Sequence, residues 1–244
     1  MSGTARFHVR ETAPGARLEL PDHSAHHARE VLRLRAGAVV HVFDGHGTEF
    51  EATLDSVTRQ GVFLRVQHEV APRPESPLRI ELALSPLKGD RMELVIQKAT
   101  ELGVTAVHPV VCARTDAVAR PALKGSRQER WEKVASGAAE QCGRAVVPEV
   151  RPTVELKHLL ARPFDGRKLQ FSEAQGAPPL DRAAARTGAV LALVGPAGGW
   201  EPHESERVRC AGFEATSLGP RILRAETAAI AAVTALQVLW GDLT

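Results

Sequence analysis

The chain has 244 residues, enough for one large domain or two smaller ones. Hydrophobic residues make up 43% and charged residues 25%, a balance that excludes disordered and fibrous proteins. The formal net charge of +2 supports a nucleic-acid partner only weakly, so a polyanion must be contacted by local clusters such as Arg29, Arg33 and Arg35.

The sequence lacks the usual signals for a metal site, a membrane span or secretion. The three cysteines are scattered without a CxxC pair, so we expect no zinc site, no other metal and no disulfide framework. The longest apolar stretch, residues 228–240, is too short to span a bilayer. Residues 1–10 contain no apolar run, so we expect no secretory signal and a cytoplasmic location.

Residues 1–72 predict a small domain built mainly of strands. Apolar or alternating runs at 38–44, 48–54 and 61–70 are typical of strands, and the first two are separated by a glycine-containing turn. One helix is expected over residues 22–33, with Asp22 as its N-cap. A small barrel of short strands with one helix fits this length.

Residues 71–77 contain three prolines and predict a stiff linker to a second domain, residues 73–244. Strands are expected at 78–84, 104–111, 168–171, 189–194 and 214–218. Helices are expected at 90–102, 128–142 and 225–240. This order predicts an α/β fold with a mainly parallel sheet and helices on both faces.

Two glycine turns in the second domain each follow an apolar strand. The patterns of phosphate-binding NTPases and of dinucleotide-binding folds are both missing, so the turns predict a pocket lined by backbone groups and apolar walls. An adenosine with a compact charged tail suits such a pocket better than a nucleoside triphosphate. The expected cofactor-binding residues are Leu193, Val194, Gly195, Gly198, Gly199, Leu218, Gly219, Ile222, Leu223, Arg224 and Thr227.

The two turns read GPAGGW at 195–200 and LGPRILRAETA at 218–228. Together with HHAREVLR at 26–33, QKATELG at 97–103 and AEQCGR at 139–144, they resemble the RsmE family along the whole chain. These SPOUT-class enzymes methylate N3 of a uridine in 16S ribosomal RNA. One departure is Ala197, where the family usually has glutamate, which puts any role for a carboxylate at that position in doubt.

The resemblance implies a PUA-like barrel before a SPOUT domain with a deep C-terminal trefoil knot. It also implies S-adenosylmethionine as cofactor, a homodimer with the active site near its interface, and 16S rRNA within a small-subunit particle as partner. Because uridine N3 must lose a proton, Arg224 is expected to stabilise the resulting anion. Glu226 is expected either to accept the proton or to orient Arg224.

Several basic side chains are candidates for RNA contacts, and each has an alternative as a solvated or structural residue. Arg144, one helical turn after Glu140, either forms a structural ion pair with it or contributes to the RNA site. The full set is Arg29, Arg33, Lys88, Arg91, Arg114 and Arg144. Two other functions stay open: a SPOUT enzyme acting on another RNA, and a non-catalytic RNA-binding module on the same fold.

Overall fold

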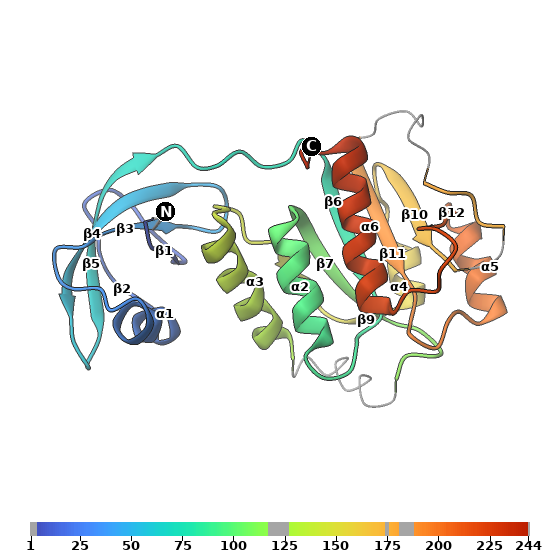
Figure 1. The fold of residues 1–244 in the computed structure, drawn as a ribbon, viewed down its shortest axis with the longest axis horizontal. Helices are drawn as coiled ribbons and strands as arrows, with labels where there is room; N and C mark the ends of the chain where they lie inside the picture. Colours follow the sequence, from blue (N-terminus) through green and yellow to red (C-terminus); the bar gives the residue numbers. More distant parts are fainter. Residues whose placement is uncertain (1–3, 117–126, 174–175, 181–187, 244) are drawn as a thin grey trace. The chain divides into compact units, whose positions relative to one another are not determined.

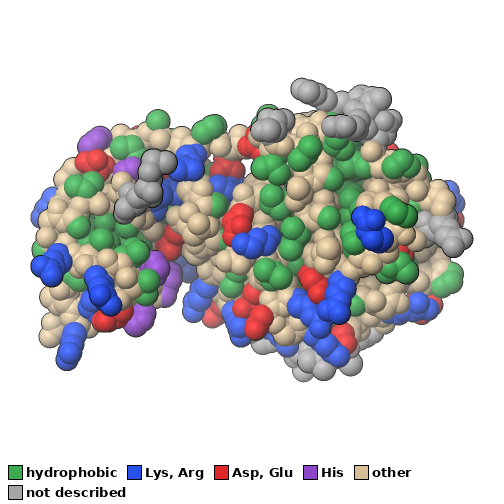
Figure 2. Space-filling view, in the orientation of Figure 1, with side chains coloured by type: hydrophobic (Ala, Val, Ile, Leu, Met, Phe, Trp, Pro, Cys, Tyr) green, Lys and Arg blue, Asp and Glu red, His purple; other side chains and the backbone are tan. Residues whose placement is uncertain are grey.

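The computed structural model describes residues 4–116, 127–173, 176–180 and 188–243 (Figure 1). Two units are formed. Unit 1 consists of Met1–Glu75 with Ser136–Val147, and unit 2 of Ser76–Ala135 with Pro148–Thr244. Acidic and basic side chains are intermixed on the face shown in Figure 2. This mixture agrees with the near-neutral net charge.

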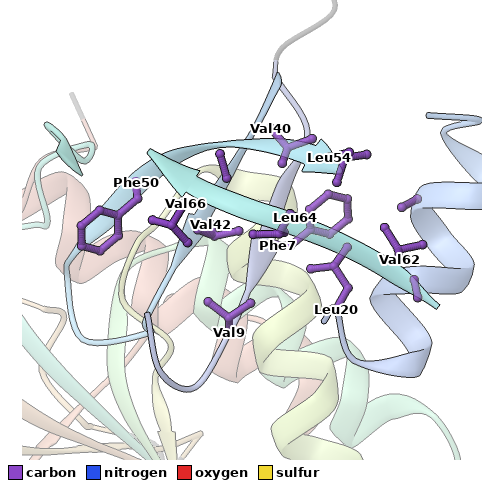
Figure 3. Packing of buried hydrophobic residues seen from close by; sticks show 13 residues of the cluster. Phe7, Val9, Leu20, Val40, Val42, Phe50, Leu54, Val62, Leu64 and Val66 are labelled. Atoms are coloured by element: carbon purple, nitrogen blue, oxygen red, sulfur yellow. The ribbon is translucent and has the colours of Figure 1, made fainter. Parts of the chain in front are cut away.

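Unit 1 is built on a five-stranded sheet with the order β1-β3-β4-β5-β2. The strands are β1 (Arg6–His8), β2 (Arg17–Glu19), β3 (Val39–Phe43), β4 (Glu49–Val57) and β5 (Val62–Val70). All pairs are antiparallel except β1 with β3. Alternate residues such as Val62, Leu64 and Val66 point inward, and they form one core with Phe7 and Leu20 (Figure 3).

The helix predicted at 22–33 is present, but in two parts. An α-helical turn, α1 (Asp22–His26), continues into a π-helical turn, η1 (His27–Val31). Pro21 rather than Asp22 occupies the N-cap, so the expected cap is wrong by one residue. Ala25 and Ala28 are buried against the sheet and hold this segment in place.

The last part of helix α3 (Gln128–Cys142) and the residues after it belong to unit 1. Arg6 donates through Nη1 to the carbonyl oxygens of Ala139 and Arg144, each at 3.2 Å. Ala139 and Ala145 also pack against Phe43 of β3. Unit 1 is therefore discontinuous in sequence, a feature that local patterns did not reveal.

Unit 2 is built on a seven-stranded sheet in which every pair is parallel. Its order is β12-β10-β11-β6-β7-β8, with β9 also pairing with β7. The strands are β6 (Arg79–Leu84), β7 (Val104–Val111), β8 (Glu149–Val150), β9 (Val154–Glu155), β10 (Arg167–Phe171), β11 (Ala189–Val194) and β12 (Glu214–Thr216). The predicted parallel sheet is confirmed.

Helices cover this sheet and explain why its central strand β11 is apolar throughout. Helices α2 (Arg91–Glu101) and α6 (Ala225–Trp240) pack on each other and lie over the near face in Figure 1. Helices α4 (Leu156–Leu160) and α5 (Pro202–Cys210) contribute Leu156, Leu159 and Val208 to a separate cluster with Leu191 and Leu193 of β11. Every residue of β11 is buried, as expected for a strand covered on both faces.

Helix α5 and the short elements β1, β2, β8, β9 and α4 were not predicted. Five of the nine residues of α5 are charged or histidine (PHESERVRC), so no apolar stripe marks it. Its start is instead fixed by a reciprocal cap between Glu201 and Glu204, with Pro202 in the first turn. A capping signal made from two glutamates lies outside the usual serine or threonine pattern.

Candidate functional site

The two predicted glycine turns enclose a cavity of about 320 Å³ at the carboxyl ends of β10, β11 and β12. This is where ligands bind in sheets of this type. Its lining combines apolar side chains, backbone of the turns and five ionisable side chains. The lining residues are Arg91, Phe171, Ser172, Glu173, Val194, Gly195, Pro196, Ala197, Gly199, Trp200, Leu218, Gly219, Arg221, Ile222, Leu223, Arg224, Ala225, Glu226 and Ala228.

The first turn has a shape that requires glycine. A Cβ atom at Gly195 would lie 2.5 Å from Nε1 of Trp200, so the indole packs directly on the bare backbone. Gly199 has a positive φ of 74° and donates its N–H to the carbonyl of Pro196 at 2.9 Å. The turn therefore presents main chain to the cavity, as expected for backbone recognition.

The second turn is held by Ser217, whose Oγ accepts the N–H of Gly219 at 3.1 Å. Gly219 has a φ of 117°, which a side chain would disfavour. After it, Ile222 is 81% exposed at the cavity edge, while Leu223 is half-buried. Arg224 then occupies the N-cap of α6 in an extended conformation, and Glu226 lies in the first turn of that helix.

The charged groups of the cavity come from three segments. Arg91 begins α2, and its Nη1 lies 3.9 Å from Oε1 of Glu226. Arg221 and Arg224 come from the second turn, and Glu173 follows β10. The sequence suggested that Glu226 orients Arg224. The ion-pair partner of Glu226 is instead Arg91. Arg91, expected only as an RNA contact, lines the same cavity.

Three of the residues expected to bind a cofactor do not line the cavity. Leu193 is fully buried with Leu191 in the cluster beneath α4 and α5. Gly198 faces Arg114, and Thr227 is exposed. Sequence reasoning also missed Phe171, Ser172 and Glu173 at the end of β10. No local pattern marks these residues, because they reach the cavity through the pairing of β10 with β11.

Arg114 braces the first turn from outside. Its Nε donates to Oε1 of Glu201 at 2.7 Å, and its Nη1 donates to the carbonyl of Gly198 at 3.1 Å. Glu204, 4% exposed, accepts the neighbouring N–H of Ala113 at 2.8 Å. Two carboxylates of α5 thus tie the segment after β7 to the glycine turn.

The other candidate RNA residues are distributed over both units. Arg29 donates to Oε1 of Glu30 and to the carbonyl of Thr58, whereas Arg33 is exposed. Lys88 pairs with Asp116 at 2.7 Å. Arg144 is 8% exposed and pairs with Glu75 at 2.6 Å.

Glu140 is half-buried and contacts two other segments of unit 1. It accepts the backbone N–H of His8 at 2.9 Å and the Ser24 hydroxyl at 3.4 Å. Burial raises the pKa of the Glu140 carboxyl above its ordinary value. These contacts indicate a structural role for Glu140.

Among the described residues, no group of three or more His, Cys, Asp or Glu side chains is arranged to hold a metal ion. Within the same residues, no helix is both long enough and apolar enough to cross a bilayer.

Comparison with known proteins gives matches over both units. An RNA methyltransferase domain family matches residues 74–237, and an RNA methyltransferase PUA domain family matches residues 20–67. Ribosomal RNA small subunit methyltransferase E of Bacillus subtilis is 32% identical, over 89% of this chain and 90% of the relative. The Mycobacterium bovis protein of the same name is 33% identical, over 87% of this chain and 83% of its own length.

Two solved structures are similar over nearly the whole chain. One is ribosomal RNA small subunit methyltransferase E from Neisseria gonorrhoeae bound to S-adenosyl methionine, with a TM-score of 0.90, 38% identity and coverage of 99% and 100%. The other, a Legionella pneumophila protein solved with bound SAM, has a TM-score of 0.91, 35% identity and the same coverage.

Proposed function

The chain belongs to the RNA methyltransferase family that includes ribosomal RNA small subunit methyltransferase E, and from this we propose its reaction and substrate. The protein is an S-adenosylmethionine-dependent ribosomal RNA methyltransferase with a PUA-like domain before a SPOUT domain. We propose that it methylates N3 of one uridine in 16S rRNA. The observation that carries this proposal is the cavity between the two glycine turns, which combines apolar walls, main chain of the turns and charges of both signs.

The residues of the cavity fit S-adenosylmethionine. Val194, Leu218 and Leu223 offer apolar contacts for an adenosine, and the two glycine turns contribute main chain to the lining. The carboxylates of Glu173 and Glu226 favour the cationic parts of the cofactor, while Arg221 favours its carboxylate. The volume of about 320 Å³ lies within the range of small-molecule sites.

Side chains at the cavity account for the rest of the chemistry. When bound, S-adenosylmethionine supplies an electrophilic methyl group on its sulfonium. Arg224 and Arg91 place two permanent positive charges at the cavity, where they stabilise the negative charge that develops on the uracil ring as N3 loses its proton. Glu226 holds the Arg91 guanidinium at 3.9 Å and also lies close enough to the cavity to accept that proton.

We further propose a homodimer that uses the outer face of α6. Glu226 is the one ionisable residue in this 16-residue helix, and Val238 is 44% exposed. Hydrophobic side chains reach the surface over α6 in Figure 2. An apolar face of this kind favours a second copy of the chain.

The remaining assignments complete the proposal. We propose that the chain between β11 and α6 is threaded as the SPOUT trefoil knot, that residues 1–72 serve RNA binding, and that residues 73–244 carry the methyltransferase. Matches of the two families on either side of residue 72 support that division. Because we propose action on 16S rRNA in a small-subunit particle, we also propose a cytoplasmic location.

The test uses small subunits from a strain in which the gene for this chain is deleted. Purified protein and labelled S-adenosylmethionine are added, and the rRNA is mapped by mass spectrometry after nuclease digestion. We expect one methyl group on one uridine base of 16S rRNA. A methyl group on another RNA or on a ribose would contradict the N3 assignment. Calorimetry showing no binding of S-adenosylmethionine would instead favour a non-catalytic RNA-binding module.

A further inference from the structure

A short turn in unit 1, residues 31–35, combines features that a merely structural turn avoids. We call it the 31–35 turn. Val31, the last residue of η1, is 61% exposed, and Leu32, its C-cap, is 40% exposed. Arg33 has a φ of 52°, the one positive φ found for a residue other than glycine in the described part of the chain. The turn begins at the last residue of the π-helical segment η1.

The fold fixes this turn from both sides. The N–H of Leu32 bonds to the carbonyl of His27, and the N–H of Leu34 bonds to the carbonyl of Ala28, both at 2.9 Å. Ala28 is fully buried and Leu34 packs against the core of unit 1. The left-handed position ends the helix, where glycine is normally favoured because it has no Cβ. Arginine at this position stores strain that the surrounding contacts maintain.

Positive charge surrounds the exposed aliphatic pair. The Arg29 side chain has a structural role, since it donates to Glu30 at 2.6 Å and to the Thr58 carbonyl at 3.0 Å. This contact also neutralises Glu30, the nearest carboxylate along the chain. Arg33 and Arg35 are both exposed, and neither side chain makes a hydrogen bond or ion pair with any residue that the structure describes. The 31–35 turn therefore offers two cations beside two apolar side chains.

We propose that the 31–35 turn binds a single-stranded part of the substrate RNA, with Val31 and Leu32 against the face of an unstacked base. Arg33 contacts the adjoining phosphate. This inference rests on the proposed function and adds a base-contacting element to it. RNA suits the surface because its phosphates complement the arginines and its unpaired bases have flat apolar faces. Two aliphatic side chains are too small an area for a stable protein interface.

The test measures binding of the full-length protein, without cofactor, to a labelled single-stranded oligouridine and to an RNA duplex of the same length. For the double substitution V31S/L32S, we expect single-strand affinity to fall about fivefold to tenfold while duplex affinity is unchanged. The salt dependence should stay the same, because no charge is lost. Both side chains are exposed, so the fold should be retained.

The second part of the RNA-binding test uses variants of Arg33. Arg33→Ala should weaken single-strand binding and reduce the slope of log K against log salt by about 0.7, the value for one phosphate contact. Arg33→Gly should have the same effect on binding but raise the thermal stability, because glycine adopts the left-handed conformation without strain. Arg10→Ala and Leu243→Ser, exposed residues elsewhere, serve as controls for loss of charge and of apolar surface.

Three results would overturn the proposal. Equal losses on single strand and duplex would show that no base is contacted. Unchanged RNA affinity in V31S/L32S would remove the apolar contact altogether. Unchanged affinity with an altered oligomeric state would identify a protein contact instead. These experiments measure RNA binding and not methyl transfer. Their result can therefore be interpreted even if the N3 assignment fails.

Discussion

Arg224 combines two roles at the level of a single residue, since it ends the second glycine turn and also lines the cavity. Its backbone is extended at the N-cap of α6, but its side chain makes no capping hydrogen bond. Alanine can adopt the same backbone conformation, so the helix should not depend on the guanidinium. The side chain is therefore available for charge stabilisation.

We expect Arg224→Ala to lower turnover by about 100-fold or more, as for loss of a group that stabilises developing charge. The dissociation constant for S-adenosylmethionine should change little, which calorimetry can check. Arg207→Ala on α5, also exposed, is the control. Unchanged turnover in the Arg224 variant would eliminate its proposed role.

Glu140 gives a pH-dependent prediction at the same scale. Because burial raises its pKa in the folded chain, the folded state binds more protons than the unfolded state above the ordinary glutamate pKa. Stability contributed by this group is present at lower pH and is lost as the pH rises through the raised pKa.

We expect Glu140→Gln to remove this loss, because the glutamine oxygen still accepts from His8 and Ser24. The variant should gain stability relative to the wild type as pH rises from about 4 towards neutral. Thermal unfolding over this range checks it, with the exposed Glu11→Gln as control. Parallel curves for Glu140→Gln and wild type would contradict the prediction.

At the scale of elements, α5 positions the cavity through the segment after β7. Loss of the Arg114 guanidinium should loosen the first glycine turn, because Gly198 and Glu201 lose a shared donor. We expect Arg114→Ala to weaken binding of S-adenosylmethionine about fivefold to tenfold. Glu201→Gln should have a similar effect, and the double variant should lose little more.

An exposed pair on the same helix, Arg209 with Glu206, provides the control for these substitutions. Arg209→Ala should leave cofactor binding unchanged, since surface pairs contribute little. The same variants decide between two roles for Arg114. Weaker RNA binding with unchanged cofactor binding would favour the phosphate contact expected from sequence.

The proposed dimer gives a prediction for the whole molecule. Val238→Glu places a charge on the apolar outer face of α6 in both copies, where burial without a partner is costly. We expect the dimer dissociation constant to rise at least about tenfold and activity to fall with it. Light scattering at several concentrations measures the first effect. Val39→Glu, at an exposed valine of β3, is the matched control. A monomeric wild type would refute the dimer.

The sequence predicted elements with strong periodicity and missed those defined by tertiary contacts. Strand β11 and helix α6 were predicted at their observed bounds, because apolar runs and a following turn mark both. Helix α5 lacks an apolar stripe. Its glutamate cap can be recognised only from the side-chain contacts in the folded structure. Glu173 joins the cavity through the pairing of β10 with β11, which no local pattern states.

The discontinuity of unit 1 has a consequence for synthesis of the chain. Residues 1–75 leave the ribosome first, but the carbonyl groups that accept from Arg6 Nη1 and the alanines that pack on Phe43 follow only with residues 139–145. At ~5–20 residues per second the wait is several seconds. During that interval the side of the nascent sheet that later receives Ala139 and Ala145 is uncovered. A chaperone that binds nascent chains could cover this side of the sheet during the interval.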